Sequence, residues 1–357
     1  MTSSTSSTID LPAPTDEPAV VVRDRRTRRR RAIGVTGALG GLTIVLFVLT
    51  MMIGETRLGP LEVVASVLGF SDSPSTDFVV RTLRLPTAVT AAAVGAALGI
   101  SGLCFQKLLS NPLASPDFVG ITSGASFFAI TAIVLLGLSG FAVSVAALAG
   151  ALLTASLIYL LAWRDGITGY RFVLIGIGVS QLFISLVGWV IVQAELFDAR
   201  EAMTWLVGSA GRAGSTELPV LLGALAVLVP AVLLLSRPLG VLELGDDAAR
   251  GLGVGVETAR RLVLLVAVVL VALATAVAGP MAFVALIAGP IAVRLLRGTG
   301  SGLPAAALVG ACVVLAADLV ARQLLPVSLP TGVVTGAVGA PYLIWLLIHV
   351  NSEGRGG

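Results

Sequence analysis

Long apolar segments alternate with short polar breaks along almost the whole chain. A helix needs about 20 residues to cross a bilayer, and the apolar pattern places ten candidate helices. They span 32–53, 83–105, 119–138, 141–163, 172–193, 218–235, 262–279, 280–296, 304–325 and 332–350. The weakest breaks fall at 138–141 and 279–281, so nine and eleven helices are the alternatives. The pattern predicts an all-α, polytopic membrane protein with about ten transmembrane helices.

The composition supports this prediction and excludes a soluble catalytic domain. Of 357 residues, 56% are hydrophobic and 12% are charged, with a mean hydropathy of +1.00. An average soluble domain has about 25% charged residues. Cys104 and Cys312 both fall within apolar segments, which is typical of small core residues rather than of a disulfide. We therefore expect one membrane domain over residues 32–350.

The N-terminal 31 residues differ in kind from the rest. They are polar, contain proline and end in seven arginines within residues 23–31. This composition predicts a disordered, arginine-rich cytoplasmic tail over 1–31, and residues 351–357 form a short C-terminal tail. A secretory signal peptide is the alternative, but the following apolar run is too long for a signal core and no small-residue cleavage site follows it cleanly.

The charge distribution predicts the sidedness of the ten helices. With the N-terminus inside, both termini are cytoplasmic. Apart from the N-terminal cluster, ten basic residues then fall on the cytoplasmic side and six on the other. Cytoplasmic flanks carry the excess of lysine and arginine in membrane proteins. We expect a multi-pass protein of the cytoplasmic membrane.

Small residues mark the second predicted helix. Gly95 and Gly99 form a G-x-x-x-G pattern, and Gly102 follows. Small residues let membrane helices approach closely where lipid offers little hydrophobic drive between them. The pattern predicts interhelical packing.

A charged segment over residues 237–261 interrupts two apolar runs. Asp246 and Asp247 suit a helix N-terminus, and Gly251 and Gly253 suit a helix end. The pattern predicts a short helix, a glycine break and a second short helix that ends at Arg260 and Arg261. A solvated loop is the alternative. The length of the segment favours a structured cytoplasmic surface for a partner.

Two further polar segments lie between predicted spans. In "SNPLASPDFVGITSGA", Asn111, Pro112 and Pro116 precede a new apolar run, and Asp117 suits its N-terminus. We expect a cytoplasmic turn that packs beside segment 237–261. The second segment, 194–217, is external and carries Trp205, a candidate interfacial anchor.

Several kinds of chemistry are excluded by residue type. A phosphate-binding Walker motif needs G-K-[ST], whereas the single lysine, Lys107, follows Gln106. ATP-driven transport would therefore need a separate ATP-binding chain. His349 is the only histidine, so we expect no histidine-rich metal site and no cofactor. Ser101, in a G-x-S-G pattern, together with His349 leaves an intramembrane serine protease as a distant alternative.

Two charged residues stand within or near an apolar span. Asp318 and Arg322 are four residues apart, so they share one helix face and neutralise each other. An ionisable residue at a helix centre costs roughly 2.5–3.5 kcal/mol on insertion scales. Arg322 is predicted to lie near the outer surface, with a functional role for its charge left open.

From about residue 60 to 350 the sequence resembles the iron-siderophore and vitamin B12 permeases of ABC importers, the FecCD or BtuC-like family. The motifs that carry the resemblance occur in order. They are "RLP" at 84–86, "VGAALGISGLCFQ" at 94–106, "NPLASPDFVGITSGA" at 111–125, "WLVGS" at 205–209, "LELGDDAARGLGV" at 242–254, "AGPMAFVALIAGPIAVRLL" at 278–296, "ADLVAR" at 317–322 and "LPTGVVTGAVGAPYLIWLL" at 329–347.

The resemblance implies a BtuC-like fold of ten helices and a permease that works as a pair of subunits without covalent chemistry of its own. Segment 237–261 would then couple transport to a separate ATP-binding subunit. The residues expected to carry this coupling are Leu244, Gly245, Asp246, Asp247, Arg250, Leu252 and Gly253. The implied cargo is a ferric siderophore, with vitamin B12 or haem as the alternative.

The resemblance also implies docking of a substrate-binding lipoprotein at the outer face. Arg84 and Arg322 match arginines that receive glutamates of that protein. The family pattern R-L-P-R ends here in Thr87, and Arg81, one turn before Arg84, is the candidate substitute. Ile291 replaces the histidine of P-H-x-x-R, and the E-L-P-x-G pattern begins here with Ser328. These departures favour pairing with a different permease chain.

Overall fold

The computed structural model describes residues 17–54, 56–70, 73–163 and 169–353, with side chains described between 26 and 348. Over these ranges the chain is helical between turns and contains no strand. The all-α prediction is confirmed.

Apolar helices lie at all ten predicted positions. They are α1 (Glu17–Met52), α4 (Leu85–Leu108), α5 (Ile121–Val134), α6 (Phe141–Ala162), α7 (Gly169–Val192), α9 (Glu217–Leu234), α12 (Val256–Ala278), α13 (Val284–Leu296), α14 (Leu303–Leu319) and α15 (Thr331–Glu353). In the described part of the chain, eight helices are long and apolar enough to cross a membrane, and α5 and α13 are shorter. Both weak breaks separate two helices, and Gly140 and Gly279 there adopt positive φ angles of 57° and 77°.

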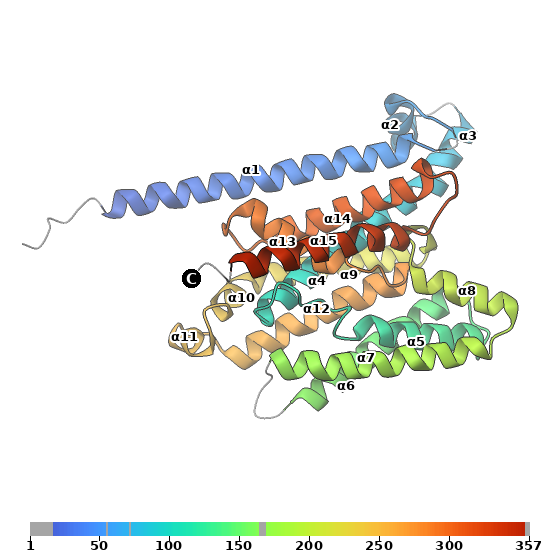
Figure 1. Ribbon diagram of the computed structural model, residues 1–357. Helices are drawn as coiled ribbons and strands as arrows, with labels where there is room; N and C mark the ends of the chain where they lie inside the picture. Colours follow the sequence, from blue (N-terminus) through green and yellow to red (C-terminus); the bar gives the residue numbers. More distant parts are fainter. Residues whose placement is uncertain (1–16, 55, 71–72, 164–168, 354–357) are drawn as a thin grey trace, which may run out of the picture.

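Short helices occupy the two ends of the bundle (Figure 1). At one end lie α2 (Pro60–Leu68), α3 (Pro74–Asp77), the π-helical turn η1 (Phe78–Arg84) and α8 (Leu196–Val207). At the other lie α10 (Ser236–Leu242) and α11 (Asp246–Gly251), together with the start of α1 and the end of α15. We call these the α2 end and the α11 end. Two more short turns, η2 (Ala210–Arg212) and η3 (Val320–Leu324), follow α8 and α14.

The first helix is longer than the sequence predicts. Residues 17–31, expected as part of a disordered tail, continue α1 as helix, whereas residues 1–16 lie outside the described part. Two properties of the sequence explain the difference. Arginine is a good helix former, and the only proline of the segment, Pro18, stands in the first turn, where proline is tolerated.

Helix α4 forms the centre of the bundle. It packs against α14, α12 and α13, and its glycines make the closest approaches. Gly95 faces the backbone at Gly310, Gly99 faces that at Ala306, and Gly102 faces that at Ala285. A Cβ atom at any of the three would overlap a carbonyl oxygen of the neighbouring helix. The prediction that these glycines serve interhelical packing is confirmed.

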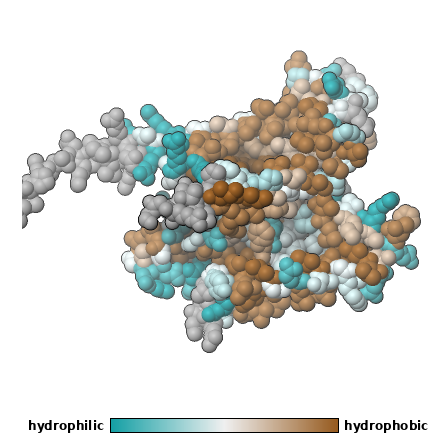
Figure 2. Space-filling view, viewed as in Figure 1, coloured by the Kyte–Doolittle hydropathy of each residue, from teal (hydrophilic) through white to brown (hydrophobic). Residues whose placement is uncertain are grey.

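The peripheral helices carry apolar side chains outward. In α7, Leu174, Trp189 and Val192 are each more than half exposed. Figure 2 shows apolar side chains over the middle of the molecule, with hydrophilic side chains gathered toward its two ends. This distribution is that of a protein whose middle is solvated by hydrocarbon.

The close approach of α4 predicts different effects for two glycine substitutions. Gly102→Ala pushes a methyl group against the backbone of α13, and overpacking of this kind costs about 1–3 kcal/mol. Gly223→Ala, in the middle of α9, meets nothing within 4 Å and improves helix propensity. In thermal melts of detergent-solubilised protein, we expect Gly102→Ala to lower the midpoint and Gly223→Ala to leave it unchanged or raise it. Equal midpoints for the two variants would contradict the packing argument.

Candidate functional site

The charged segment 237–261 folds into two short helices at the α11 end. Helix α11 begins at Asp246, with Asp247 beside it in the first turn, as the sequence predicts. Gly245 and Gly253 flank it with φ angles of +96° and +79°, which only glycine adopts without strain. One detail of the prediction is wrong. Arg260 and Arg261 lie in the second turn of the long helix α12 and not at the end of a separate short helix.

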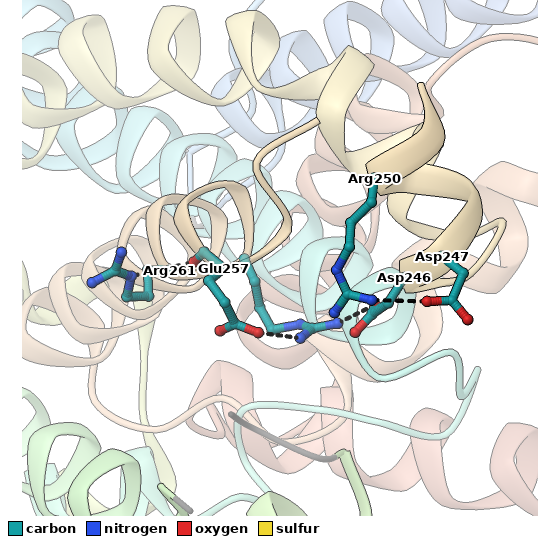
Figure 3. A network of polar contacts seen from close by, with 6 residues as sticks. Asp246, Asp247, Arg250, Glu257 and Arg261 are labelled. Carbon is teal, nitrogen blue, oxygen red and sulfur yellow. Dashed lines mark hydrogen bonds and ion pairs between the residues drawn. The ribbon is translucent and has the colours of Figure 1, made fainter. Parts of the chain in front are cut away.

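Apolar and ionic contacts fix this segment to the bundle. Leu242, Ala249, Val256 and Ala259 form a small buried cluster beneath α11. Arg260 then ties α11 to α12, because its guanidinium donates to the carboxylate of Asp246 at 2.7 Å and to that of Glu257 at 3.3 Å (Figure 3).

A second ion pair ties the segment to α4. It joins Lys107, near the C-terminal end of α4, to Glu243, which follows α10. The lysine side chain is mostly buried, with 15% of it exposed. The segment is therefore held at both of its short helices.

The outer face of α11 has no partner within the described structure. Leu244 and Leu252 stand on either side of α11 and are 65% and 64% exposed. Asp247 and Arg250 pair only with each other, at 2.8 Å, on the exposed surface between them. Two exposed leucines rimmed by charges on a fixed platform are typical of a protein-docking surface.

The polar turn after α4 lies beside this platform. The side chain of Asn111 accepts a hydrogen bond from the Leu113 amide at 2.9 Å. Gln106 donates to the carbonyl of Pro112 at 3.0 Å and to that of Leu286 in α13 at 2.9 Å. Pro116 is buried. The turn is thus braced by α4 and α13.

A cavity of about 540 Å³ opens between this turn and α13, and Glu243 of the charged segment lies at its wall. Asn111, Pro112, Lys107, Glu243 and Arg294 contribute to its lining. Its walls therefore carry cationic and polar groups at the α11 end of the bundle.

Asp117 is the titratable group of this turn. Burial raises the pKa of its carboxyl group to about 7, and hydrogen bonds from Ser115 and Thr122 oppose that shift.

At the α2 end, two of the predicted docking arginines cap helices. The Arg84 guanidinium donates to the carbonyls of Met51 at 2.8 Å and Met52 at 3.3 Å, the last residues of α1, and to that of Thr56 at 2.6 Å. Arg81 donates to the carbonyl of Ser66 at 2.8 Å near the end of α2. A cation suits the end of a helix, where carbonyls lack partners. Both arginines therefore hold the loops of this end in place.

Arg322 belongs to a buried polar network. It donates to Asp318 at 2.8 Å and to the Ser209 hydroxyl at 3.3 Å. Asp318 is 1% exposed and also accepts a hydrogen bond from Thr331 at 2.7 Å. The predicted neutralisation of Asp318 by Arg322 is confirmed, and the network joins α14, α15 and the turn after α8.

Arg84 and Arg322 meet at one cavity. This cavity measures about 430 Å³, and both arginines line it together with Asp318. Thr87 and Ser328, two of the positions at which the chain departs from the family pattern, also line it. Arg81 is not among its lining residues. The structure thus brings Arg84 and Arg322 together and leaves Arg81 apart.

Beside this cavity, close backbone contacts join segments far apart in sequence. The Ser209 amide donates to the Ala278 carbonyl at 2.7 Å, and the Gly332 amide donates to the Gly208 carbonyl at 3.0 Å. Trp205 is 1% exposed, so its prediction as an interfacial anchor is wrong. The turns at 208 and 279 approach each other beside its backbone too closely for side chains there. The glycines at these turns were the only sequence signal of this contact.

Ser101, the serine proposed for a protease, is not arranged for catalysis, and the side chain of His349 lies outside the described part of the structure. The Ser101 hydroxyl is fully buried and donates to the carbonyl of Ala267 in α12 at 2.7 Å. A nucleophilic serine needs a base as its hydrogen-bond acceptor. Cys104 and Cys312 are both free and buried, as expected for core residues.

Comparison with known proteins identifies the fold and the family. The model of the FecCD transport family matches residues 42–349. The chain belongs to this family. FecCD proteins are membrane permease subunits of ABC transporters, which fits the described helices and the exposed platform at the α11 end.

Several relatives align over most of their length. The ferric enterobactin transport system permease protein FepG of Escherichia coli is 43% identical over 84% of this chain and 91% of its own. The achromobactin transport system permease protein CbrC of Dickeya dadantii is 41% identical over 86% and 89%. The vitamin B12 import system permease protein BtuC of Klebsiella pneumoniae is 35% identical over 94% and 97%.

A solved structure has the same architecture. It is an ABC transporter described as of the metal-chelate type, in an inward-facing conformation. It covers 89% of this chain and 99% of its own with 29% identity and a TM-score of 0.77. The predicted BtuC-like permease fold is confirmed.

Proposed function

We propose that this chain is a permease subunit that carries a ferric siderophore across the cytoplasmic membrane. The observation that carries the proposal is its membership of the FecCD transport family together with the names of its relatives, among them permeases for ferric enterobactin and achromobactin. Vitamin B12 is the second candidate cargo, favoured by the 35% identity to a BtuC protein.

The energy for transport comes from a partner chain in this proposal. The sequence has no G-K-[ST] motif for phosphate binding. The platform around α11 offers a partner two exposed leucines at a position braced by Arg260 and Lys107. A braced platform transmits displacement because its ion pairs tie it to α4 and α12. The α11 end is then cytoplasmic, and both termini are too.

The α2 end receives the substrate-binding lipoprotein in this proposal. Arg84 and Arg322 share one cavity there and present their charges from fixed positions. Thr87 and Ser328 remove charge from that cavity relative to the family pattern. This chain then offers the lipoprotein a weaker docking surface than the family pattern does. We therefore propose that it assembles with a different permease chain, one that keeps the family's charged residues.

Uptake measurements test the choice of cargo. In a strain that lacks this subunit, we expect loss of radioactive iron uptake from one of ferric enterobactin, ferric hydroxamate or ferric citrate, and normal uptake of cobalamin. Restoring the gene recovers uptake. Loss of cobalamin uptake with normal uptake from all three iron chelates would overturn the siderophore proposal and favour vitamin B12.

The exposed leucines predict the contact with the ATP-binding subunit. Each side chain is worth about 1.5–3 kcal/mol when fully buried, so Leu244→Asp with Leu252→Asp weakens assembly with the ATPase at least tenfold. Melting of the isolated permease stays unchanged because both side chains are already in solvent. The control is Leu61→Asp at the α2 end, where Leu61 is 83% exposed. Equal co-purification of the ATPase with all variants would refute the assignment.

The missing arginine predicts a gain of function. Thr87 lines the cavity between Arg84 and Arg322, so Thr87→Arg restores the charge of the family pattern there. Charges at an interface rim mainly raise the association rate. We expect binding-protein association to accelerate about two- to fivefold at low salt, with the gain lost at high salt. Thr87→Gln is the uncharged control, and the same rate for both variants would argue against docking at this cavity.

A further inference from the structure

A groove lies between α6 and α12, outside the two candidate docking surfaces. It encloses about 490 Å³, and five residues of α6 and four of α12 line it. Its walls are apolar, with Leu152 and Leu160 on one side and Leu264 and Val268 on the other. Arg261 is the only charged residue of the lining.

The groove runs from a charged mouth into the apolar middle of the bundle. Helix α12 starts at the α11 end (Figure 1), and Arg261 lies near that start. Val268 lies seven residues further along α12, which is about 10 Å deeper at 1.5 Å per residue. A phospholipid has the same order of groups, because its charged headgroup lies at the surface and its acyl chains extend inward.

Arg261 forms no ion pair with the described residues of the protein. Its Nε donates to the backbone carbonyl of Glu257 at 3.2 Å. Among the described residues no carboxylate pairs with it; Glu257 and Asp246 both form their ion pairs with Arg260. Figure 3 shows the Arg261 guanidinium pointing away from this network. The groove mouth is therefore cationic.

Aromatic side chains mark the level of the mouth. Tyr159 lines the groove one turn from Ser156 and two turns from Leu152 on the same face of α6, and its ring packs against Trp163 with centroids 5.5 Å apart. Trp163 is 44% exposed. Tryptophan and tyrosine gather where headgroups meet hydrocarbon. Arg261 thus stands at headgroup depth.

We propose that this groove binds an anionic phospholipid. The headgroup phosphate is held by Arg261 and the Tyr159 hydroxyl, and one acyl chain lies between the leucines of α6 and α12. Basic pockets between membrane helices recognise acidic headgroups in this way. The site adjoins Arg260, so a bound lipid lies next to the ion pairs that fix α11.

Lipid titration of the intact purified transporter tests the proposal. Retention of phosphatidylglycerol and of phosphatidylcholine is measured by native mass spectrometry, with thermal melts in parallel. We expect phosphatidylglycerol to bind more tightly, and Arg261→Gln to weaken its binding about fivefold without changing the melting midpoint in detergent. Arg261→Lys retains most of the affinity because it keeps the charge.

Two matched variants separate the site from general lipid coating. Arg237→Gln removes an exposed arginine at the same end but outside the groove and leaves binding unchanged. Ser156→Phe fills the groove from an exposed position and weakens both lipids. Equal binding of the two lipids, or equal loss in Arg261→Gln and Arg237→Gln, overturns the proposal. Competition by inorganic phosphate or glycerol 3-phosphate overturns it too, because the site would then bind a free anion.

Discussion

The close backbone contact of α4 with α13 and α14 is the interaction on which the rest of the structure depends. Hydrocarbon solvates leucine as well as another helix does, so burial alone does not hold membrane helices together. Gly95, Gly99 and Gly102 remove side chains from one face of α4, and the carbonyls of the neighbouring helices approach it directly. Dispersion contacts over this length then fix α4 as the axis around which α12, α13 and α14 are placed.

Because α4 is fixed, the residues at its two ends hold polar contacts in defined positions. At the α11 end, Lys107 and Gln106 reach from α4 to Glu243 and to the turn at Pro112. At the α2 end, Arg84 precedes α4 and closes the last turn of α1. The two candidate docking surfaces thus lie at opposite ends of one rigid helix. In the proposed function, this arrangement links the ATPase side to the binding-protein side.

The charged residues serve structure and recognition together. Arg84 donates hydrogen bonds to backbone carbonyls at the end of α1, and Arg322 neutralises the charge of the buried Asp318. Each arginine is thereby held in one orientation, which reduces the entropy lost when a partner binds. Leu244 and Leu252 differ from the arginines, because most of each side chain remains exposed beside a braced helix. Arg261 is a third case, a cation at the mouth of an apolar groove with no ion-pair partner in the part of the chain that the structure describes.

Hydropathy by itself determined the ten helices, because a segment that crosses hydrocarbon must be predominantly apolar and must satisfy its own backbone hydrogen bonds. Local rules likewise determined the start of α11 at Asp246 and the turn at Asn111. They failed where a residue's role depends on distant segments. Trp205 is buried, and the turns at Gly208 and Gly279 meet beside it. Only the tertiary structure decided that Arg84 and Arg322 line one cavity while Arg81 caps α2. Arg84 and Arg322 are far apart in the sequence, and the hydrophobic periodicity of a helix predicts no contact over such a separation.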